Sequence, residues 1–79
     1  MKTVYILKSM PSPDRHYIGI AIDAEERLAE HNRGESFHTA KFRPWKLEVA
    51  VQFAADSKAN AFERYLKSGS GRAFAKKHF

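Results

Sequence analysis

Large apolar residues alternate with small or polar ones from residue 46 to residue 55. Because neighbouring side chains of a β-strand point to opposite faces, Leu47, Val49, Val51 and Phe53 are expected on one face. The segment is therefore predicted to be a strand with one strongly apolar face. A chain of 79 residues has room for only one core around such a strand, so we predict a single domain over residues 1–79.

Two further strands are predicted ahead of it, at residues 3–9 and 16–20, because both segments are rich in β-branched and aromatic residues. The six residues between them include two prolines and turn-forming Ser and Asp, which indicates a hairpin. If odd-numbered residues pair with odd-numbered ones, Tyr5 and Tyr17 project from the same face; a slip of one residue would separate them. Gly19 is expected to let the backbone bend or approach a neighbour closely.

A first helix is predicted over residues 24–33. Asp23 and Glu26 have the spacing of a capping box at its start, and Gly34 is placed to end it in a left-handed conformation. Arg27 and His31, four residues apart, then share one face of this helix.

A second helix is predicted to begin at Asp56 or Ser57 and to end at residues 68–69. Its expected buried stripe consists of Ala59, Phe62 and Leu66. Residues 68–71, Ser-Gly-Ser-Gly, are expected to form a flexible joint to a last basic turn or helix at residues 72–78. The predicted fold class is thus α+β: a three-stranded, mostly antiparallel sheet flanked by helices, in the order ββαβα plus a short C-terminal helix.

Residues 35–45 show no clear period and mix aromatic with basic side chains. In such a mixture aromatic rings can stack on bases while cations bind phosphates, so Lys41 and Arg43 are candidate contacts to nucleic acid. The alternative is that the aromatic residues fold back over the small core, and we favour it for Trp45 because large aromatic side chains are usually well buried.

Basic residues are concentrated in the second half of the chain. The sequence has 14 Lys and Arg against 9 Asp and Glu, a formal charge of +5 at pH 7 with His neutral. Residues 1–40 carry five basic and six acidic side chains, whereas residues 41–79 carry nine and three. Nucleic acid is therefore a candidate partner, with Lys67 and Arg72 as candidate contacts; the alternative is an ordinary solvated basic surface.

The sequence contains no cysteine. This excludes disulfides, thiolate zinc sites and thiol nucleophiles, and it favours a cytoplasmic location. The four histidines have no pair at a metal-ligand spacing, so a zinc site built from histidines is not expected. The apolar run at residues 4–7 is too short for a signal peptide or a membrane span, and we expect a monomer with no membrane partner.

Five polar residues lie at the ends of the expected elements: Tyr5, Tyr17, Arg27, His31 and Glu63. Their order resembles that of the GIY-YIG nuclease superfamily, most closely its small bacterial single-domain members. The second family motif is matched in full by Tyr17-Ile18-Gly19. The first is degenerate, since Thr3 and Val4 stand where the family has Gly and Ile, although the tyrosine is kept. The likeness extends over nearly the whole chain.

The resemblance implies a metal-dependent endonuclease that hydrolyses phosphodiester bonds in DNA, in a structure-directed or repair-related role. In this view Glu63 holds one Mg²⁺ or Mn²⁺ ion, and Arg27 holds the phosphate and offsets charge in the transition state. Tyr5 activates the attacking water, and Tyr17 orients that water or a phosphate oxygen. His31 accepts a proton from Tyr5 or contacts the substrate.

Each of these residues also has an ordinary structural interpretation. Glu63 can pair with Lys67 one helical turn away, a contact worth about 0.3 to 0.5 kcal/mol. Arg27 can pair with Glu30, His31 can be a surface residue of the helix, and the tyrosines can pack on the sheet with their hydroxyls at its rim.

Two other functions remain open. A catalytically inactive nucleic-acid-binding module of the same fold is consistent with the degenerate first motif. A protein-interaction domain could instead dock its basic half on an acidic partner. Even as a nuclease, a domain this small is expected to be weakly specific unless a partner protein supplies specificity.

Overall fold

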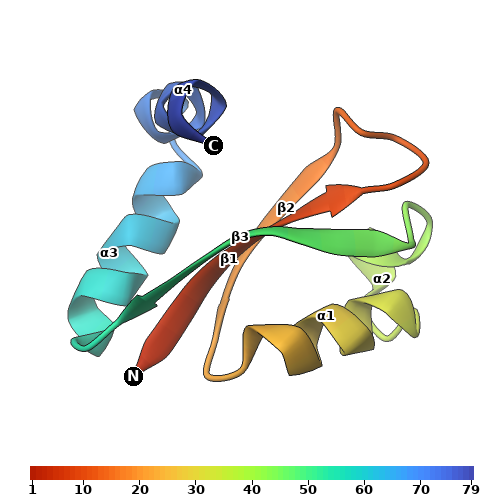
Figure 1. Ribbon diagram of the computed structural model, residues 1–79, viewed down its shortest axis with the longest axis horizontal. Helices are drawn as coiled ribbons and strands as arrows, with labels where there is room; N and C mark the ends of the chain where they lie inside the picture. The colour runs from red at the N-terminus through yellow and green to blue at the C-terminus, as the bar shows by residue number, and fades with distance from the viewer.

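Three antiparallel strands form one sheet with β1 at its centre, in the order β2-β1-β3 (Figure 1). The computed structural model describes residues 1–79. Its elements in chain order are β1 (Lys2–Ser9), β2 (His16–Ala21), α1 (Ala24–Asn32), α2 (Phe37–Ala40), β3 (Trp45–Phe53), α3 (Asp56–Leu66) and α4 (Gly69–His78). The predicted α+β class and the order of the strands and main helices are confirmed.

The β1–β2 hairpin has the register that places both candidate tyrosines on one face. Its six-residue loop is closed by the Ser9 amide, which donates to the Arg15 carbonyl at 3.0 Å. Tyr5 pairs with Gly19, and Leu7 pairs with Tyr17. Because paired residues of antiparallel strands project from the same face, the rings of the two tyrosines lie together on one side of the sheet.

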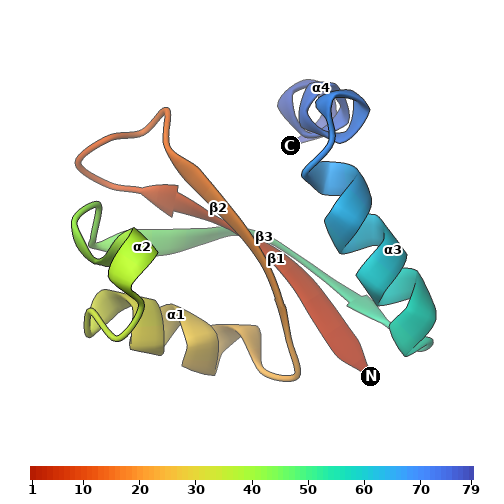
Figure 2. The same ribbon diagram turned by 180° about the vertical axis from the view of Figure 1, so that it is seen from behind.

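Helices cover both faces of the sheet, which therefore separates two apolar clusters (Figures 1 and 2). On the side of α3, Val4 and Ile6 pack against Ala59 and Leu66. The predicted buried stripe of α3 is thus confirmed. The cluster on the side of α1 is built around Tyr5, Leu7, Ala24 and Trp45. The burial of Trp45, 5% exposed, confirms that this ring belongs to the core.

A β-bulge divides the apolar face predicted for β3. Ile6 pairs with Val49 and the next residue, Leu7, pairs with Leu47, so Glu48 has no partner on β1. The extra residue reverses the alternation, and Leu47 packs in the α1-side cluster while Val49 packs in the α3-side cluster. The prediction of a single apolar face was therefore wrong at Leu47.

The start and end of α1 follow the sequence signals. The Asp23 carboxylate accepts from the Glu26 amide at 3.1 Å, and Gly34 has a φ of +80°. The basis is the ordinary chemistry of caps: a short polar side chain satisfies a free amide, and glycine adopts the left-handed region without a steric penalty.

The C-terminal helices depart from the prediction. The segment 68–71 is no flexible joint, because α4 begins at Gly69 and its N-cap Ser68 accepts from the Gly71 amide. Gly71 is buried against α3, where an added Cβ would lie 1.7 Å from the Tyr65 carbonyl oxygen. The close contact fixes the angle between α3 and α4 and requires glycine. No helix in the chain is both long and apolar enough to cross a membrane.

Candidate active site

Tyr5 occupies the centre of the sheet on the α1 side and is fully buried. Its ring lies over Gly19, where an added Cβ would be 2.3 Å from the Tyr5 hydroxyl oxygen. The ring of Tyr17 lies 6.4 Å from that of Tyr5, centroid to centroid. The glycine of the second motif therefore makes the space that the tyrosine of the first motif occupies.

His31 reaches this pair from the last turn of α1 and is also buried, with 2% exposed. Its Nε2 lies 3.4 Å from the Tyr5 hydroxyl, and its ring centroid lies 4.7 Å from that of Tyr17. On the other side of the ring, Nδ1 lies 2.8 Å from the Thr39 hydroxyl. The interpretation of His31 as a surface residue of the helix was wrong, because β1, β2 and α2 enclose it.

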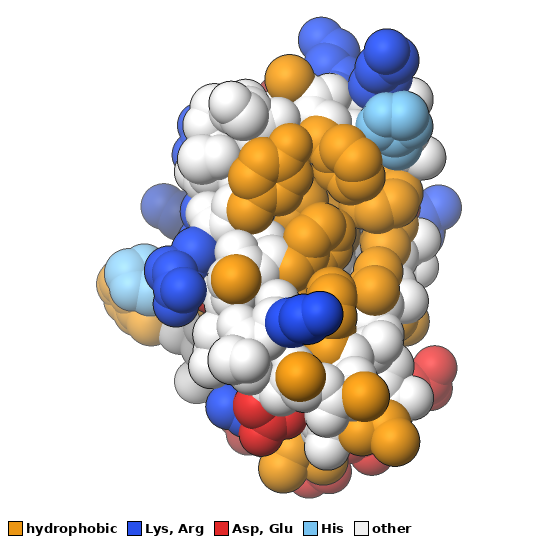
Figure 3. Space-filling view, turned by 90° about the vertical axis from the view of Figure 1, so that its left-hand side faces the viewer, with side chains coloured by type: hydrophobic (Ala, Val, Ile, Leu, Met, Phe, Trp, Pro, Cys, Tyr) orange, Lys and Arg blue, Asp and Glu red, His pale blue; other side chains and the backbone are white.

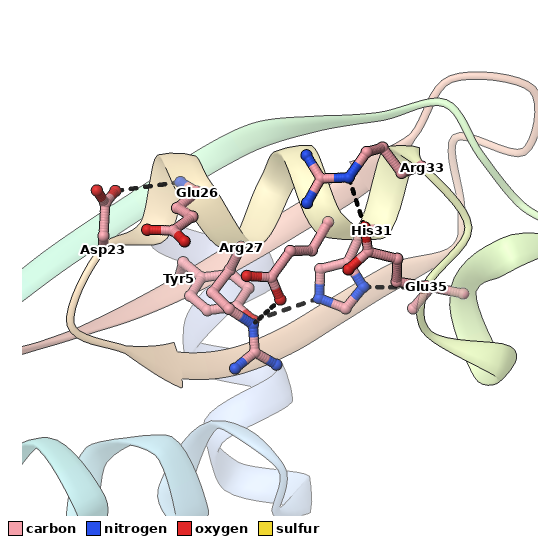
Figure 4. A network of polar contacts seen from close by, with 9 residues as sticks. Tyr5, Asp23, Glu26, Arg27, His31, Arg33 and Glu35 are labelled. Carbon is pink, nitrogen blue, oxygen red and sulfur yellow. Dashed lines mark hydrogen bonds and ion pairs between the residues drawn. The ribbon is translucent and has the colours of Figure 1, made fainter.

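Arg27 lies one turn before His31 on the same face of α1. Figure 4 shows both side chains reaching from α1 towards Tyr5. The Arg27 Nε lies 3.4 Å from a Glu30 carboxylate oxygen, so the ion pair expected from the sequence is present. However, this buried Nε forms no hydrogen bond. The Glu30 carboxylate lies beside this buried Nε, so the exposed part of the guanidinium is the part that can donate to an anion.

Burial and the Arg27 charge set the protonation states of this cluster. Burial raises the pKa of Tyr5 from 10.0 to about 12, although the positive charge of Arg27 opposes the shift. Burial, with a further contribution from Arg27, lowers the pKa of His31 below 6.5. At neutral pH the pair therefore consists of a neutral phenol and a neutral imidazole.

Glu63 lies on α3, which covers the face of the sheet opposite to α1, and its negative charge makes the smallest of the contributions to the pKa of Tyr5. Its side chain is 16% exposed and forms an ion pair with Lys67. The pair predicted as the structural alternative is thus present, and it holds the carboxylate against α3.

The donor set around Glu63 fits one kind of metal ion. No group of three or more His, Cys, Asp or Glu side chains converges anywhere in the chain. A cation that needs several protein ligands, such as structural zinc, does not fit. Mg²⁺ keeps several waters and is often held by one or two carboxylates together with substrate phosphate, so the single carboxylate of Glu63 is compatible with it.

The four candidate nucleic-acid contacts lie in two separate places. Lys67 and Arg72 line a hollow of about 800 Å³ between the sheet and the α3–α4 pair, together with Lys76. Figure 3 shows the outer side of α3 and α4, where apolar side chains gather with scattered Lys and Arg side chains near them. Lys41 and Arg43 are exposed on the α2–β3 connection, at the other end of the molecule (Figure 1).

The residues that support His31 are absent from the sequence-based prediction. The short helix α2 carries Thr39, which is 2% exposed and contacts His31 directly. Asn32 holds the start of β3, since its side chain donates to the Trp45 carbonyl and accepts from the Trp45 amide. The indole of Trp45 in turn donates to the Thr39 carbonyl at 2.9 Å. A four-residue helix is too short to show a period, so only the polar Thr39 eight residues after His31 could have pointed to this contact.

Comparison with known proteins identifies the arrangement. The family model of the GIY-YIG catalytic domain matches residues 1–77. The structure-specific endonuclease subunit SLX1 of Candida dubliniensis is 42% identical over 71 residues, which covers 81% of this chain and 25% of that protein. The protein of the same name from Debaryomyces hansenii is 37% identical over 71 residues, covering 81% of this chain and 20% of its own length.

The chain thus spans about a quarter or less of the length of these curated relatives. Both relatives are fungal. The more specific likeness to small bacterial members therefore stays a prediction, whereas the family itself is confirmed.

Proposed function

Since the chain belongs to the GIY-YIG family of catalytic domains, we propose that it is an endonuclease that hydrolyses phosphodiester bonds in DNA with one Mg²⁺ ion, or Mn²⁺ in its place. The observation that supports this most strongly is the contact between the hydroxyl of Tyr5 and the neutral imidazole of His31. Arg27, whose buried Nε has no hydrogen-bond partner, lies beside them. These three groups can move a proton and bind an anion, which are two of the requirements for attack of water on a phosphodiester.

Arg27 is placed to bind the scissile phosphate. Its guanidinium has a rigid set of donors that suits phosphate oxygens, and its Nε lacks a hydrogen-bond partner. The negative charge on the phosphoryl oxygens is spread over the transition state, so a fixed cation at this position lowers the barrier. The Glu30 carboxylate lies 3.4 Å from the Arg27 Nε and restrains the arginine, while 43% of the Arg27 side chain stays exposed.

Tyr5, fully buried in the protein without DNA, is the group that removes a proton from the attacking water once bound substrate brings that water to its hydroxyl. With a pKa of about 12 the phenol cannot be ionised in advance at neutral pH, so it must lose its own proton as it gains one from water. The His31 Nε2, 3.4 Å away, is the acceptor for that proton. Tyr17, packed against the imidazole, is placed to orient the water or a phosphate oxygen.

Nucleases of this family use a divalent metal ion, and Glu63 is the carboxylate that would hold it here. Such an ion, when bound, supplies Lewis-acid stabilisation of the phosphoryl and leaving oxygens. Lys67, now paired with Glu63, must release the carboxylate for the ion to bind.

The names of the relatives support a proposal about substrate and partner. Each of the two relatives is named as a subunit of a structure-specific endonuclease. We accordingly expect branched DNA to be a better substrate than plain duplex. We also expect a protein partner to supply specificity that so small a domain lacks.

The Glu63→Gln variant tests the proposal. It removes the carboxylate charge with little change of shape, and cleavage of a labelled branched DNA in Mg²⁺ should fall by about 100-fold or more. Glu25→Gln is the matched control, because Glu25 is exposed in the first turn of α1 and its loss should leave cleavage unchanged. Cleavage by the Glu63→Gln variant at the wild-type rate would contradict the metal assignment.

The wild-type protein distinguishes the other two functions in the same assay. Binding of the branched DNA with no cleavage in Mg²⁺ or Mn²⁺ would identify an inactive nucleic-acid-binding module. No binding even at low salt would point to a protein-interaction domain, because phosphate contacts are strongest at low salt.

A further inference from the structure

The hydroxyl of Thr39 is the only hydrogen-bond partner of the His31 Nδ1. Each ring nitrogen of His31 therefore has one neighbour, Thr39 on one side and the Tyr5 hydroxyl on the other. A neutral imidazole carries one proton and one lone pair, so the contact at Nδ1 decides which of them faces Tyr5.

We propose that Thr39 is a positioning residue that holds His31 in the tautomer with the proton on Nδ1 and the lone pair on Nε2. Three protons need acceptors, those of Tyr5, His31 and Thr39. In this tautomer the Tyr5 hydroxyl donates to Nε2, Nδ1–H donates to the Thr39 hydroxyl oxygen, and the Thr39 hydroxyl donates to the Ser36 carbonyl at 3.4 Å. All three protons then have an acceptor.

The other tautomer leaves one proton without an acceptor. If Nε2 carried the proton it would donate to the Tyr5 oxygen, and the Thr39 hydroxyl would turn to donate to Nδ1. In the protein without DNA the proton of Tyr5 would then have no acceptor, because the buried hydroxyl has no hydrogen-bond partner apart from His31. A buried donor left without an acceptor is strongly disfavoured, so the first tautomer is the stable one.

The surroundings fix the Thr39 hydroxyl in place. The side chain is 2% exposed, and the backbone carbonyl of Thr39 accepts from both the Trp45 indole and the Phe42 amide. The Thr39 amide donates to the Ser36 carbonyl at 3.2 Å. The segment that showed no period in the sequence is thus a rigid support for one side of the imidazole.

The consequence for the proposed function is direct. With the lone pair of Nε2 facing Tyr5, His31 can accept the phenol proton while Tyr5 takes one from water. The resulting imidazolium keeps its Nδ1–H bond to Thr39, so the charged form is stabilised without movement of the ring. The tautomer itself does not depend on the proposed function, and only the kinetic effect does.

Long-range ¹H–¹⁵N NMR of the protein without DNA measures the tautomer. At pH 8 the ¹⁵N chemical shifts of the two ring nitrogens distinguish a protonated nitrogen from an unprotonated one. The His31 signals are assigned by their absence from the spectrum of the His31→Gln variant. The result expected for the wild type is a protonated Nδ1. A protonated Nε2 in the wild type would overturn the proposal, and this measurement needs no folded Thr39 variant.

Variants of Thr39 test its role. Thr39→Val keeps the shape of the side chain and removes its hydroxyl, so it should shift His31 towards the other tautomer. We expect kcat to fall by about tenfold while KM stays within about twofold of the wild-type value. Thr39→Ser keeps the hydroxyl and should retain the wild-type tautomer, with kcat largely restored. Thr3→Val is the matched control, because Thr3 is a second buried threonine and its hydroxyl makes no hydrogen bond.

The two proposals fail in different ways. An unchanged tautomer in a folded Thr39→Val protein would refute the role of Thr39, whatever the activity. The predicted tautomers together with no cleavage by the wild type would refute the nuclease while leaving the role of Thr39 in place.

Discussion

Burial determines what Tyr5 and His31 can do as individual residues. A phenol that is fully buried holds its proton more tightly, and an imidazole that is buried holds an added proton less tightly. Tyr5 alone would be a poor base at neutral pH. In contact with a neutral His31, however, it can pass one proton on as it receives another, which is how two weak groups can act together.

The pH dependence of stability follows from the lowered pKa of His31. The folded protein binds a proton on His31 less readily than the unfolded chain, so His31 contributes stability above pH 6.5 that is lost as the pH falls through its folded pKa. Charged or titratable groups around the ring are Arg27, Glu30, Tyr5 and Tyr17. Denaturant unfolding between pH 4 and pH 8 should show this loss.

The His31→Gln variant should lack that part of the pH dependence, whereas the exposed His38→Gln should retain it. A stability profile that is the same in the wild type and the His31→Gln variant would show that the folded pKa of His31 is not lowered.

Short-range periodicity predicts the residues of the site only in part. The period of two places Tyr5 and Tyr17 on one face, and the helical spacing of four places Arg27 beside His31. The contact with Thr39 depends on the path of the chain after Gly34, which no local pattern describes. For Glu63 the structural interpretation is the one present in the structure, and the catalytic one requires the ion pair with Lys67 to open.

Among the secondary-structure elements, the β1–β2 pair has the tightest steric requirement. Gly19 on β2 lies directly opposite Tyr5 on β1, and the ring fills the space that a side chain would take. The sequence predicts that the backbone at Gly19 bends or approaches a neighbour closely, but it does not identify Tyr5 as that neighbour. The requirement couples the two family motifs, because the second supplies the space for the first.

The Gly19→Ala variant should therefore displace the Tyr5 ring. The added Cβ would lie 2.3 Å from the hydroxyl oxygen, and overpacking of this kind costs about 1 to 3 kcal/mol. Urea unfolding and the cleavage assay should both show a loss. Gly69→Ala is the control, since its Cβ would meet nothing within 4 Å and should stabilise α4 by roughly 0.4 to 1 kcal/mol. Equal stability of the two variants would contradict the packing argument.

Two segments differ from the sequence-based prediction, and the physical cause is the same in both. The segment 68–71 looks flexible because Ser and Gly are weak helix formers, yet the Ser68 cap and the contact of Gly71 with α3 make it the start of α4. The bulge at Glu48 moves Leu47 to the other face because β3 pairs with β1 in two registers. In both places tertiary contacts outweigh local preference.

At the scale of the whole molecule, the excess of basic residues in the second half of the chain gathers partly around the α3–α4 hollow. Cations there release counterions when they bind phosphates, so DNA affinity should fall steeply with salt. The second set, Lys41 and Arg43, lies far enough away to contact a different part of a long substrate.

The Arg72→Gln variant should lower the slope of log Kd against log salt by about one, because one phosphate contact is lost. Fluorescence anisotropy with branched DNA at several salt concentrations measures it. Arg33→Gln is the control, since Arg33 is exposed and already paired with Glu35. A slope unchanged by Arg72→Gln would mean that the DNA does not follow the α3–α4 side.

The most direct test of the account is single-turnover cleavage of branched DNA in Mg²⁺ by the Tyr5→Phe variant, with DNA affinity measured in parallel. Removal of the hydroxyl that connects water to His31 should lower the cleavage rate by about 100-fold or more while the affinity stays within about twofold of the wild type. Tyr65→Phe, which alters an exposed tyrosine of α3, should cleave at the wild-type rate. Cleavage by Tyr5→Phe at the wild-type rate would contradict the proposal that the Tyr5–His31 pair accepts the proton of the attacking water.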